Sequence, residues 1–333
     1  MTEVIRSFWH GPPLNPYLLL CLGSFAKRGY PVEVFSYERS PGFPSWIVAR
    51  EAGEILPTDS VMVYRRGPGA GSPALHANLF RLLLLDRFGG WWADTDAALL
   101  RPELPATSFY FMVEENHYTN SIMKFPQAHP LLAEAAGLAR AAGDDVPWAT
   151  TGPTLLTALI CKHGLEAWAA SSEQGCPFIY KDVPAFFDPE RTEEMMARAS
   201  SSSFMHLCCE IWRRIGFPTD LGPPAGSFLD LQFRQSGLDI RFPGRIELRH
   251  LAVWMANAKA KAELETTSVD LERTRADLEK ARASLETTRA DLTSAEAAVK
   301  AELESYHQMV ESSRWSRLGR LLGLGPSARR PWR

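Results

Sequence analysis

Residues 89–96 read Gly-Gly-Trp-Trp-Ala-Asp-Thr-Asp, and this octet constrains the fold more than any other stretch of the chain. Aromatic residues are typical of strands, and two carboxylates follow them directly, at Asp94 and Asp96. In a regular strand, residues two apart leave the same face about 7 Å from each other, so both carboxylates can reach one ion. Mg²⁺ and Mn²⁺ prefer oxygen ligands of this kind. The octet therefore predicts a strand that ends in a metal site.

The segment before the octet matters, because a chain with 39 acidic residues can hold an Asp-x-Asp triplet on a solvated turn by chance. Apolar residues recur at helical spacing over residues 76–88, and Gly89 and Gly90 then end the helix. Arg81 lies just beside this apolar stripe. Its planar guanidinium suits phosphate or sugar oxygens, with an ordinary surface arginine as the alternative.

The run from Asn78 to Asp96 resembles the sugar-binding region of glycosyltransferase family 32, the yeast-type α-1,6-mannosyltransferases and lactosylceramide galactosyltransferases, and of the related glucosylating bacterial toxins. Their pattern is Ser-Asp-x-x-Arg, a helix, Gly-Gly, two residues of which the second is usually aromatic, and Asp-x-Asp. Six residues match it in register: Arg81, Gly89, Gly90, Trp92, Asp94 and Asp96. Asn78 departs from it, because asparagine keeps the hydrogen-bonding shape of the usual aspartate but removes its charge.

The resemblance implies a GT-A type domain that binds a nucleotide-sugar donor and a divalent metal. Asp94 and Asp96 would hold Mn²⁺ or Mg²⁺ against the donor diphosphate, and Arg81 would add a second cation at the leaving group. Asn78 and Trp92 would contact the donor. Members of the family retain the anomeric configuration, which implies retention here as well.

Three further matches extend the resemblance. Residues 4–11 resemble the family's opening strand and its Trp-x-Gly turn, so Trp9 is a candidate for packing on the nucleotide base; a buried core indole is the alternative. Asn120 stands where relatives often carry an asparagine that faces the donor sugar. The Thr-Gly-Pro run at 151–153 resembles the start of a helix beside the acceptor cleft, which makes Gly152 a donor-site candidate; a routine proline in the first helical turn is the alternative.

His206 and Trp212 resemble the family's histidine that is followed six positions later by tryptophan. An imidazole there can complete the metal shell or bind the diphosphate, because it is compatible with Mn²⁺ and with phosphate oxygens. The resemblance places Trp212 among the donor-binding residues. A hydrogen-bonded core histidine is the alternative for His206, since the surrounding segment is apolar.

The composition sets broad bounds. A chain of 333 residues with 45% hydrophobic content can bury a sizeable core, and the net charge of −3 argues against a nucleic-acid partner. The five cysteines are odd in number and show no Cys-x-x-Cys spacing, which favours a reducing compartment. The residues before the first expected strand do not show the basic region and following apolar region of a signal peptide. No apolar run approaches the ~20 residues that span a bilayer. We expect a cytoplasmic protein, peripheral at the inner face of the membrane if its tail docks there.

Strands and helices are expected to alternate along the first 165 residues. The strands lie near residues 4–9, 32–36, 60–64, 91–94 and 109–114, and the helices near residues 16–28, 74–88, 129–141 and 153–163. This alternation predicts an α/β domain with a mostly parallel sheet, whose ligand binds at the carboxyl ends of the strands. The glycine-rich loop at 65–73 lacks the Gly-Lys-Ser/Thr ending of a phosphate-binding loop, so we interpret it as a flexible connection.

The composition changes after Trp254, which divides the chain into a catalytic domain (1–255), a helical stalk (256–311) and a basic tail (312–333). Residues 256–304 contain no Gly, Pro or aromatic residue, which predicts a long helix, some 75 Å for 50 residues. Apolar residues recur in it every seven positions: Leu264, Leu271, Leu278, Leu285, Leu292 and Val299. The companion heptad positions are polar or charged, so self-association through a weak coiled coil and a solitary charged helix both remain open.

The tail at 312–333 contains six arginines and no acidic residue, interleaved with Trp and Leu. This mixture suits an anionic membrane surface, where a lipid-linked acceptor would be met. Three glycines weaken its helix, so a disordered tail is the alternative.

We therefore expect a metal-dependent, retaining hexosyltransferase that moves a sugar from a nucleotide-sugar donor to a glycan or lipid-linked acceptor in cell-surface polysaccharide synthesis. Two alternatives remain. In a haloacid-dehalogenase-type phosphatase Asp94 would be the nucleophile and Asp96 the acid/base, although that class usually carries the motif on its first strand. In a non-catalytic coiled-coil adaptor the sugar-binding head would have lost turnover, which Asn78 favours.

Overall fold

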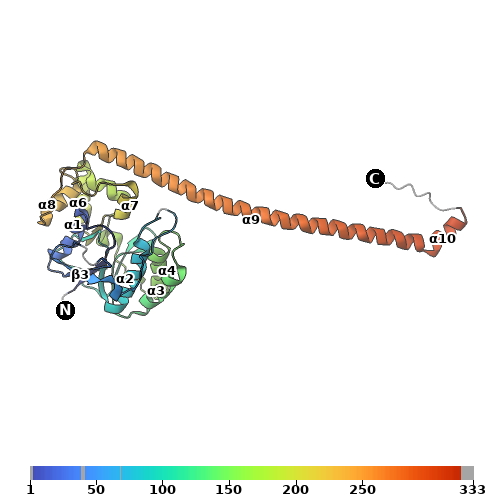
Figure 1. Cartoon of the computed structure of the whole chain (residues 1–333), viewed down its shortest axis with the longest axis horizontal. Helices are drawn as coiled ribbons and strands as arrows, with labels where there is room; N and C mark the ends of the chain where they lie inside the picture. The colour runs from blue at the N-terminus through green and yellow to red at the C-terminus, as the bar shows by residue number, and fades with distance from the viewer. Residues whose placement is uncertain (1–2, 39–41, 68, 324–333) are drawn as a thin grey trace. The chain divides into compact units, whose positions relative to one another are not determined.

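The structure is a computed structural model that describes residues 3–38, 42–67 and 69–323 (Figure 1). The chain divides into two compact units, Met1–Glu265 and Thr266–Arg333. The helix α9 (Leu248–Ser312) begins in the first unit and continues into the second. The boundaries expected at residues 255 and 311 stay predictions.

A six-stranded sheet organises the first unit, in the order β3-β2-β1-β4-β7-β6. Its strands are β1 (Ile5–Phe8), β2 (Val32–Ser36), β3 (Ile47–Glu51), β4 (Gly90–Ala93), β6 (Tyr110–Glu114) and β7 (His117–Phe125). The strands β3, β2, β1 and β4 run parallel to one another, and β7 pairs antiparallel with both β4 and β6. A separate antiparallel ribbon joins β5 (Ala97–Leu99) to β8 (Phe204–His206). The expected α/β class with a mostly parallel sheet and a long C-terminal helix is confirmed.

Helices cover both faces of the sheet, and the two consecutive tryptophans of β4 show how. Successive strand residues point to opposite faces, so Trp91 packs into the core that contains α1, whereas Trp92 packs into the core beneath α2, α3 and α4. Figure 1 shows these last three helices together on one side of the first unit. The helices of this unit are α1 (Pro16–Ala26), α2 (Ala74–Phe88), α3 (Pro130–Ala142), α4 (Leu155–Lys162), α5 (Ser172–Gly175), α6 (Thr192–Ser200), α7 (Cys209–Ile215) and α8 (Phe228–Ser236).

Local sequence explains where several helices begin. The side chain of Asn15 accepts hydrogen bonds from the backbone of Tyr17 and Leu18, and Pro16 fills the first turn of α1, where its missing N–H costs nothing. The expected helix at 153–163 starts slightly later, because a π-helical turn, η2 (Thr150–Thr154), precedes α4. All four expected helices of the first 165 residues are present.

The prediction of a strand at residues 60–64 is wrong. Within the described residues this segment forms only an isolated bridge, between Tyr64 and Ala70, and β3 takes the edge of the sheet beside β2. The β-branched residues of the segment have the composition of a strand, but such preferences depend on packing against a partner strand, and here no partner lies beside it in the described part of the chain. The bridge also closes the loop that we expected to be a flexible connection.

The described part of the second unit is mainly helical. The apolar residues of the heptad row between Leu264 and Val299 are 51% to 71% exposed on α9. The helix α10 (Arg314–Leu321) follows, and residues 324–333 of the expected basic tail lie outside the described residues. Among the helices that are described, none is both long and apolar enough to cross a membrane.

Candidate functional site

The Asp-x-Asp motif lies on a turn rather than along a regular strand. The strand β4 ends at Ala93; the Asp94 N–H then donates to the carbonyl of Ser121 on β7 at 2.7 Å. The Ala97 N–H donates to the Asp94 carbonyl at 2.9 Å and closes a four-residue turn. The expectation that strand periodicity aligns the two carboxylates is therefore wrong, because the turn from β4 into β5 brings them together.

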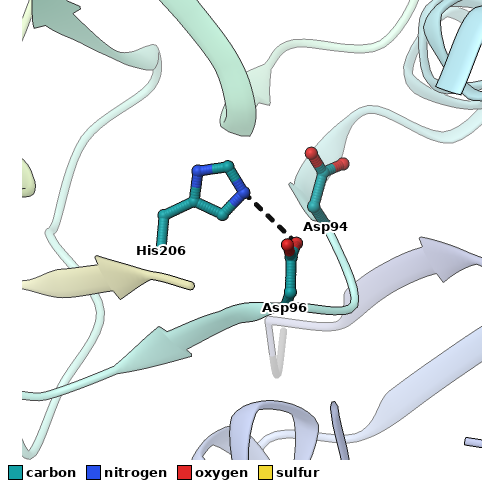
Figure 2. A group of neighbouring side chains, drawn as sticks. All are labelled: Asp94, Asp96 and His206. Atoms are coloured by element: carbon teal, nitrogen blue, oxygen red, sulfur yellow. Dashed lines mark ion pairs between the residues drawn. The ribbon is translucent and has the colours of Figure 1, made fainter. Parts of the chain in front are cut away.

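A paired strand brings His206 to the same place. In the β5–β8 ribbon His206 lies opposite Ala97, and the Leu207 N–H donates to the Asp96 carbonyl at 3.0 Å. The His206 Nε2 atom is 3.2 Å from Asp96 Oδ1, and Figure 2 shows the ring directed at that carboxylate with Asp94 beside it. One ligand atom from each of the three side chains lies within 4.8 Å of the other two.

The three side chains remain reachable from solvent. Those of Asp94, Asp96 and His206 are 23%, 13% and 23% exposed. Two carboxylates and an imidazole are donors that Mn²⁺ accepts, and Mg²⁺ accepts the carboxylates. The group is thus a candidate metal centre that is partly exposed to solvent.

The two carboxylates differ in their electrostatics. Burial acts to raise the pKa of Asp96, but the imidazole of His206 and the N–H of Cys209, which donates at 2.7 Å, outweigh it and hold that pKa below its usual range. Burial and the negative charge of Asp96 raise the pKa of Asp94, against the opposing charge of Arg81. For His206, burial acts to lower the pKa, but the Cys208 sulfur and Asp96 outweigh it and raise the pKa well above its usual range.

Arg81 fixes the position of Asp94. Its guanidinium lies 3.1 Å from Asp94 Oδ1, donates to the carbonyl of Asn120, and lies over the Trp92 ring with 5.0 Å between Cζ and the ring centroid. The Trp92 Nε1–H donates to the same Asp94 oxygen at 2.8 Å. Arg81 is only 3% exposed, so the ordinary-surface-arginine alternative is wrong.

A buried amide cluster lies beside this arginine. The Asn78 carbonyl oxygen accepts from Asn120 Nδ2 at 2.9 Å, and the Asn78 amide donates to Tyr64 at 3.3 Å and to Thr151 at 3.4 Å. Gly152 closes the cluster, because a Cβ atom there would come within 3.0 Å of both asparagine side chains. The expected donor residues Asn78, Asn120 and Gly152 are therefore brought together from α2, β7 and η2.

Three tryptophans are expected at the donor site, and the structure distinguishes them. Trp92 is 1% exposed, its Nε1–H is bound to Asp94 and Arg81 lies over its ring, so it positions Asp94 and offers no open face to the donor. Trp9 follows β1, is partly buried, and donates from Nε1 to the carbonyl of Pro12 at 2.8 Å, so it is not the fully buried core indole of the alternative. Trp212 is 1% exposed and packs against the rings of Tyr17, Phe187 and Phe217. The prediction that Trp212 binds the donor is therefore wrong, because an indole enclosed by core aromatic rings offers no face to a ligand.

Glu114 is a nearby acidic residue that sequence reasoning missed. It ends β6, burial raises the pKa of its carboxyl, and the charge of His206 is the main opposing influence. The strands β6 and β4 are both antiparallel to β7, so their carboxyl ends lie at the same edge of the sheet. A search for acidic residues at strand ends would have found it.

No protein-family model matches the chain, and no curated protein is similar to it. Among solved structures, the glycosyltransferase PaToxG shares 13% identity, with a TM-score of 0.37 over 71% of this chain and 85% of PaToxG. The apo form of the glycosyltransferase GlyE from Streptococcus pneumoniae TIGR4 shares 7% identity, with a TM-score of 0.34 over 79% of this chain and 64% of GlyE. A second GlyE structure gives 8% identity and a TM-score of 0.35 over the same shares. Identities and TM-scores are low, so a function for the chain must be argued from its own residues.

Proposed function

We propose that the chain is a metal-dependent glycosyltransferase of GT-A type that moves a hexose from a nucleotide-sugar donor to a glycan or lipid-linked acceptor. The observation that carries the proposal is the convergence of Asp94, Asp96 and His206, whose ligand atoms lie within 4.8 Å of one another. The match of residues 78–96 to the family 32 pattern supports it, because the pattern and the geometry select the same two carboxylates.

The donor set fits Mn²⁺ or Mg²⁺, held by Asp94, Asp96 and His206. When bound, such an ion supplies positive charge that neutralises a departing diphosphate. His206 must lose its proton to act as a ligand, and its raised pKa means that proton release accompanies binding. The lowered pKa of Asp96 means that this carboxylate need not release a proton when the ion binds.

The neighbouring residues hold and orient the donor in this proposal. Arg81 holds Asp94 in place and opposes the rise in the pKa of that carboxyl, and its charge also favours the diphosphate. Asn78 and Asn120, whose side-chain amides are hydrogen-bonded to each other, form a polar wall for the sugar, and Gly152 fits against both because it has no side chain. Trp9 packs on the base. We keep retention of configuration as part of the proposal, on the resemblance alone.

The hydrogen bonds of Asp94 favour glycosyl transfer over the phosphatase alternative. As a phosphatase nucleophile Asp94 would need a free carboxylate oxygen, yet its Oδ1 atom accepts from Trp92 and lies against Arg81, and its Oδ2 atom accepts from Arg81 at 3.3 Å. Contacts to both oxygens fix the orientation of the carboxylate, which suits a metal ligand that is held in place.

The rest of the chain suits a place near a membrane. We propose that α9 mediates self-association through its exposed apolar row, that the basic tail at 312–333 makes peripheral contact with the inner face of the membrane, and that the enzyme acts in the cytoplasm in cell-surface polysaccharide synthesis.

Nucleotide-sugar turnover tests the proposal. UDP-glucose, UDP-galactose, UDP-N-acetylglucosamine and GDP-mannose are each incubated with the protein in Mn²⁺, in Mg²⁺ and in EDTA, and release of the nucleotide is measured. We expect one donor to be hydrolysed slowly, only with metal, and not by the Asp96→Asn variant. Asp239→Asn is the matched control, because that aspartate is 81% exposed and pairs only locally with Arg241. Turnover of an aryl phosphate that Asp94→Asn abolishes would establish the phosphatase instead, and a donor panel without any turnover would favour the adaptor.

A further inference from the structure

A cavity of about 520 Å³ lies in the first unit, and none of the candidate metal ligands lines it. Its walls come from the carboxyl-terminal parts of α1, α6 and α8 and from the segment 98–102. Met205 of β8 contributes to it from the ribbon. Its volume falls within the ~300–1,000 Å³ of small-molecule sites.

The β5–β8 ribbon separates this cavity from the metal centre. Ala98 and Met205 are paired across the ribbon and line the cavity, whereas the adjacent pair, Ala97 and His206, belongs to the metal side. Successive strand residues point to opposite faces, so the cavity lies behind the ribbon as seen from His206. It is a second, distinct site.

Three cations line the cavity, and each binds backbone carbonyls. Lys27 donates to Gln235 at 2.7 Å, Arg28 donates to Ser24 at 2.7 Å and to Leu100 at 2.8 Å, and Arg101 donates to Ser201 at 2.6 Å. No acidic residue is among the residues that line the cavity, and in the described ranges none of the three cations forms an ion pair.

Helix capping accounts for only part of this charge. The carbonyls of Ser24, Gln235 and Ser201 lie in or directly after the last turns of α1, α8 and α6, and a cation there offsets the helix dipole. Each helix end carries about half a negative charge, so three ends offset about half of the three positive charges. Lys27 and Arg101 each use one donor in these contacts, which leaves N–H groups for a ligand.

Part of the remaining wall is apolar, and the rest carries polar side chains, those of Ser24, Ser200, Gln232, Gln235 and Ser236. Leu20, Leu99 and Met205 are buried side chains, and Met196 is partly buried beside them. Methionine adapts its shape to irregular apolar ligands. We propose that this cavity binds an organic anion, a phosphate or carboxylate group joined to an apolar body, with the anion at Lys27, Arg28 and Arg101 and the apolar part against the leucines and methionines.

Methionine methyl NMR tests the proposal on the full chain, with octyl phosphate as the probe and inorganic phosphate as the comparison. We expect saturable shifts at Met196 and Met205 with octyl phosphate, and binding of inorganic phosphate at least about tenfold weaker, because the apolar contacts add affinity. Equal affinity for both probes would overturn the apolar half of the proposal, and no saturable shift at either methionine would overturn all of it.

Variants separate the site from general charge effects. Lys27→Gln together with Arg101→Gln should weaken octyl phosphate binding about tenfold or more, and Ala199→Leu should weaken it by filling the cavity. The control, Arg65→Gln with Arg66→Gln, removes two exposed arginines that pair with Asp144 and Asp145 away from the cavity. Unchanged binding in the first double variant, with thermal unfolding like that of the control, would contradict the proposal.

The source of the anion is resolved by a second measurement. Co-sedimentation with phosphatidylglycerol vesicles that is lost in the Lys27→Gln, Arg101→Gln variant supports a lipid as the source. Binding of octyl phosphate without such a vesicle effect supports a soluble metabolite of the same chemistry. A third outcome is that octyl phosphate does not bind and that the double variant binds vesicles as well as the wild type does. In that case the lipid contact lies in another part of the chain, and the cavity is not a binding site.

Discussion

The carboxylate of Asp96 and the imidazole of His206 lie 3.2 Å apart because the residues beside them belong to one ribbon, in which Ala97 pairs with His206. Asp94 comes from the other side of the same turn, at the end of β4 in the main sheet. The candidate metal centre therefore lies where the chain passes from one sheet to the other, and its geometry depends on that turn.

Arg81→Gln should reduce both stability and turnover. The substitution leaves the Asp94 carboxylate without its cation in a site where Arg81 is 3% exposed, and breaking a buried pair on one side costs about 3 kcal/mol. Turnover should fall about 100-fold, as for loss of one electrostatic contact to a leaving group. Urea unfolding and nucleotide release measure the two effects. Arg81→Lys, which keeps the charge, should recover part of the turnover. Wild-type stability of Arg81→Gln would contradict the role of Arg81 in holding Asp94 in place.

Gly152→Ala should disturb the amide cluster. The new Cβ would come within 3.0 Å of the Asn78 and Asn120 side chains, and the backbone of Gly152 has φ −110° and ψ −114°, outside helical values. Overpacking of this kind costs about 1–3 kcal/mol. We expect a lower urea midpoint together with a higher KM for the donor. Gly137→Ala is the control, because nothing lies within 4 Å of its Cβ position.

His76 should make stability depend on pH. Its ring is fully buried against Tyr37, and burial, with a smaller effect from His10, lowers its pKa from 6.5 to about 4. Above pH 6.5 the ring is neutral in both states and the full stability is present. As the pH falls from 6.5 toward 4, only the unfolded chain takes up the proton, so the free energy of unfolding should fall by about 3 kcal/mol in total.

Urea unfolding at several pH values measures this effect. His76→Gln should be less stable at pH 7 and should lose this part of the pH dependence. His307→Gln, at an exposed position of α9, should behave like the wild type. An equal pH slope in wild type and His76→Gln would show that other groups cause the dependence.

The exposed row on α9 should cause self-association. Leu278 and Leu285 are 52% and 69% exposed, and burying such a side chain in a partner gains about 1.5 kcal/mol or more. We expect sedimentation equilibrium to show a concentration-dependent oligomer for the wild type and a monomer for Leu278→Ser with Leu285→Ser. Ala283→Ser, on another face of the helix, should not change the oligomer. A wild type that stays monomeric at every concentration would indicate a solitary helix.

Some elements could be predicted because their pattern is local. The helix α2 and the strand β4 follow from a continuous apolar stripe, two glycines and two tryptophans. The strands β3 and β7 were missed, since β3 is an edge strand with Val48 exposed, and β7 mixes buried Thr119 and Ser121 with apolar residues. Neither pattern resembles the apolar runs of a central parallel strand.

The candidate site also combines features that a local sequence pattern predicts with features that it does not. The two carboxylates were evident from the motif, but their alignment depends on a hydrogen bond from Asp94 to Ser121 that no sequence pattern signals. His206 was selected through the resemblance, and its approach to Asp96 depends on pairing between strands that are far apart in the sequence. Trp212 was misplaced because a tryptophan in a core and one in a pocket have the same local pattern, and only the surrounding rings of Tyr17 and Phe187 distinguish them.

Direct measurement of Mn²⁺ binding tests the central claim without relying on turnover. Free Mn²⁺ gives an electron paramagnetic resonance signal that weakens when the ion binds, so a titration yields affinity and stoichiometry. We expect one Mn²⁺ per chain in the presence of a nucleoside diphosphate, and about tenfold or greater weakening in Asp94→Asn, Asp96→Asn and His206→Gln. Asp239→Asn should bind like the wild type. Absence of bound Mn²⁺ in the wild type, or undiminished binding in Asp96→Asn, would contradict the account.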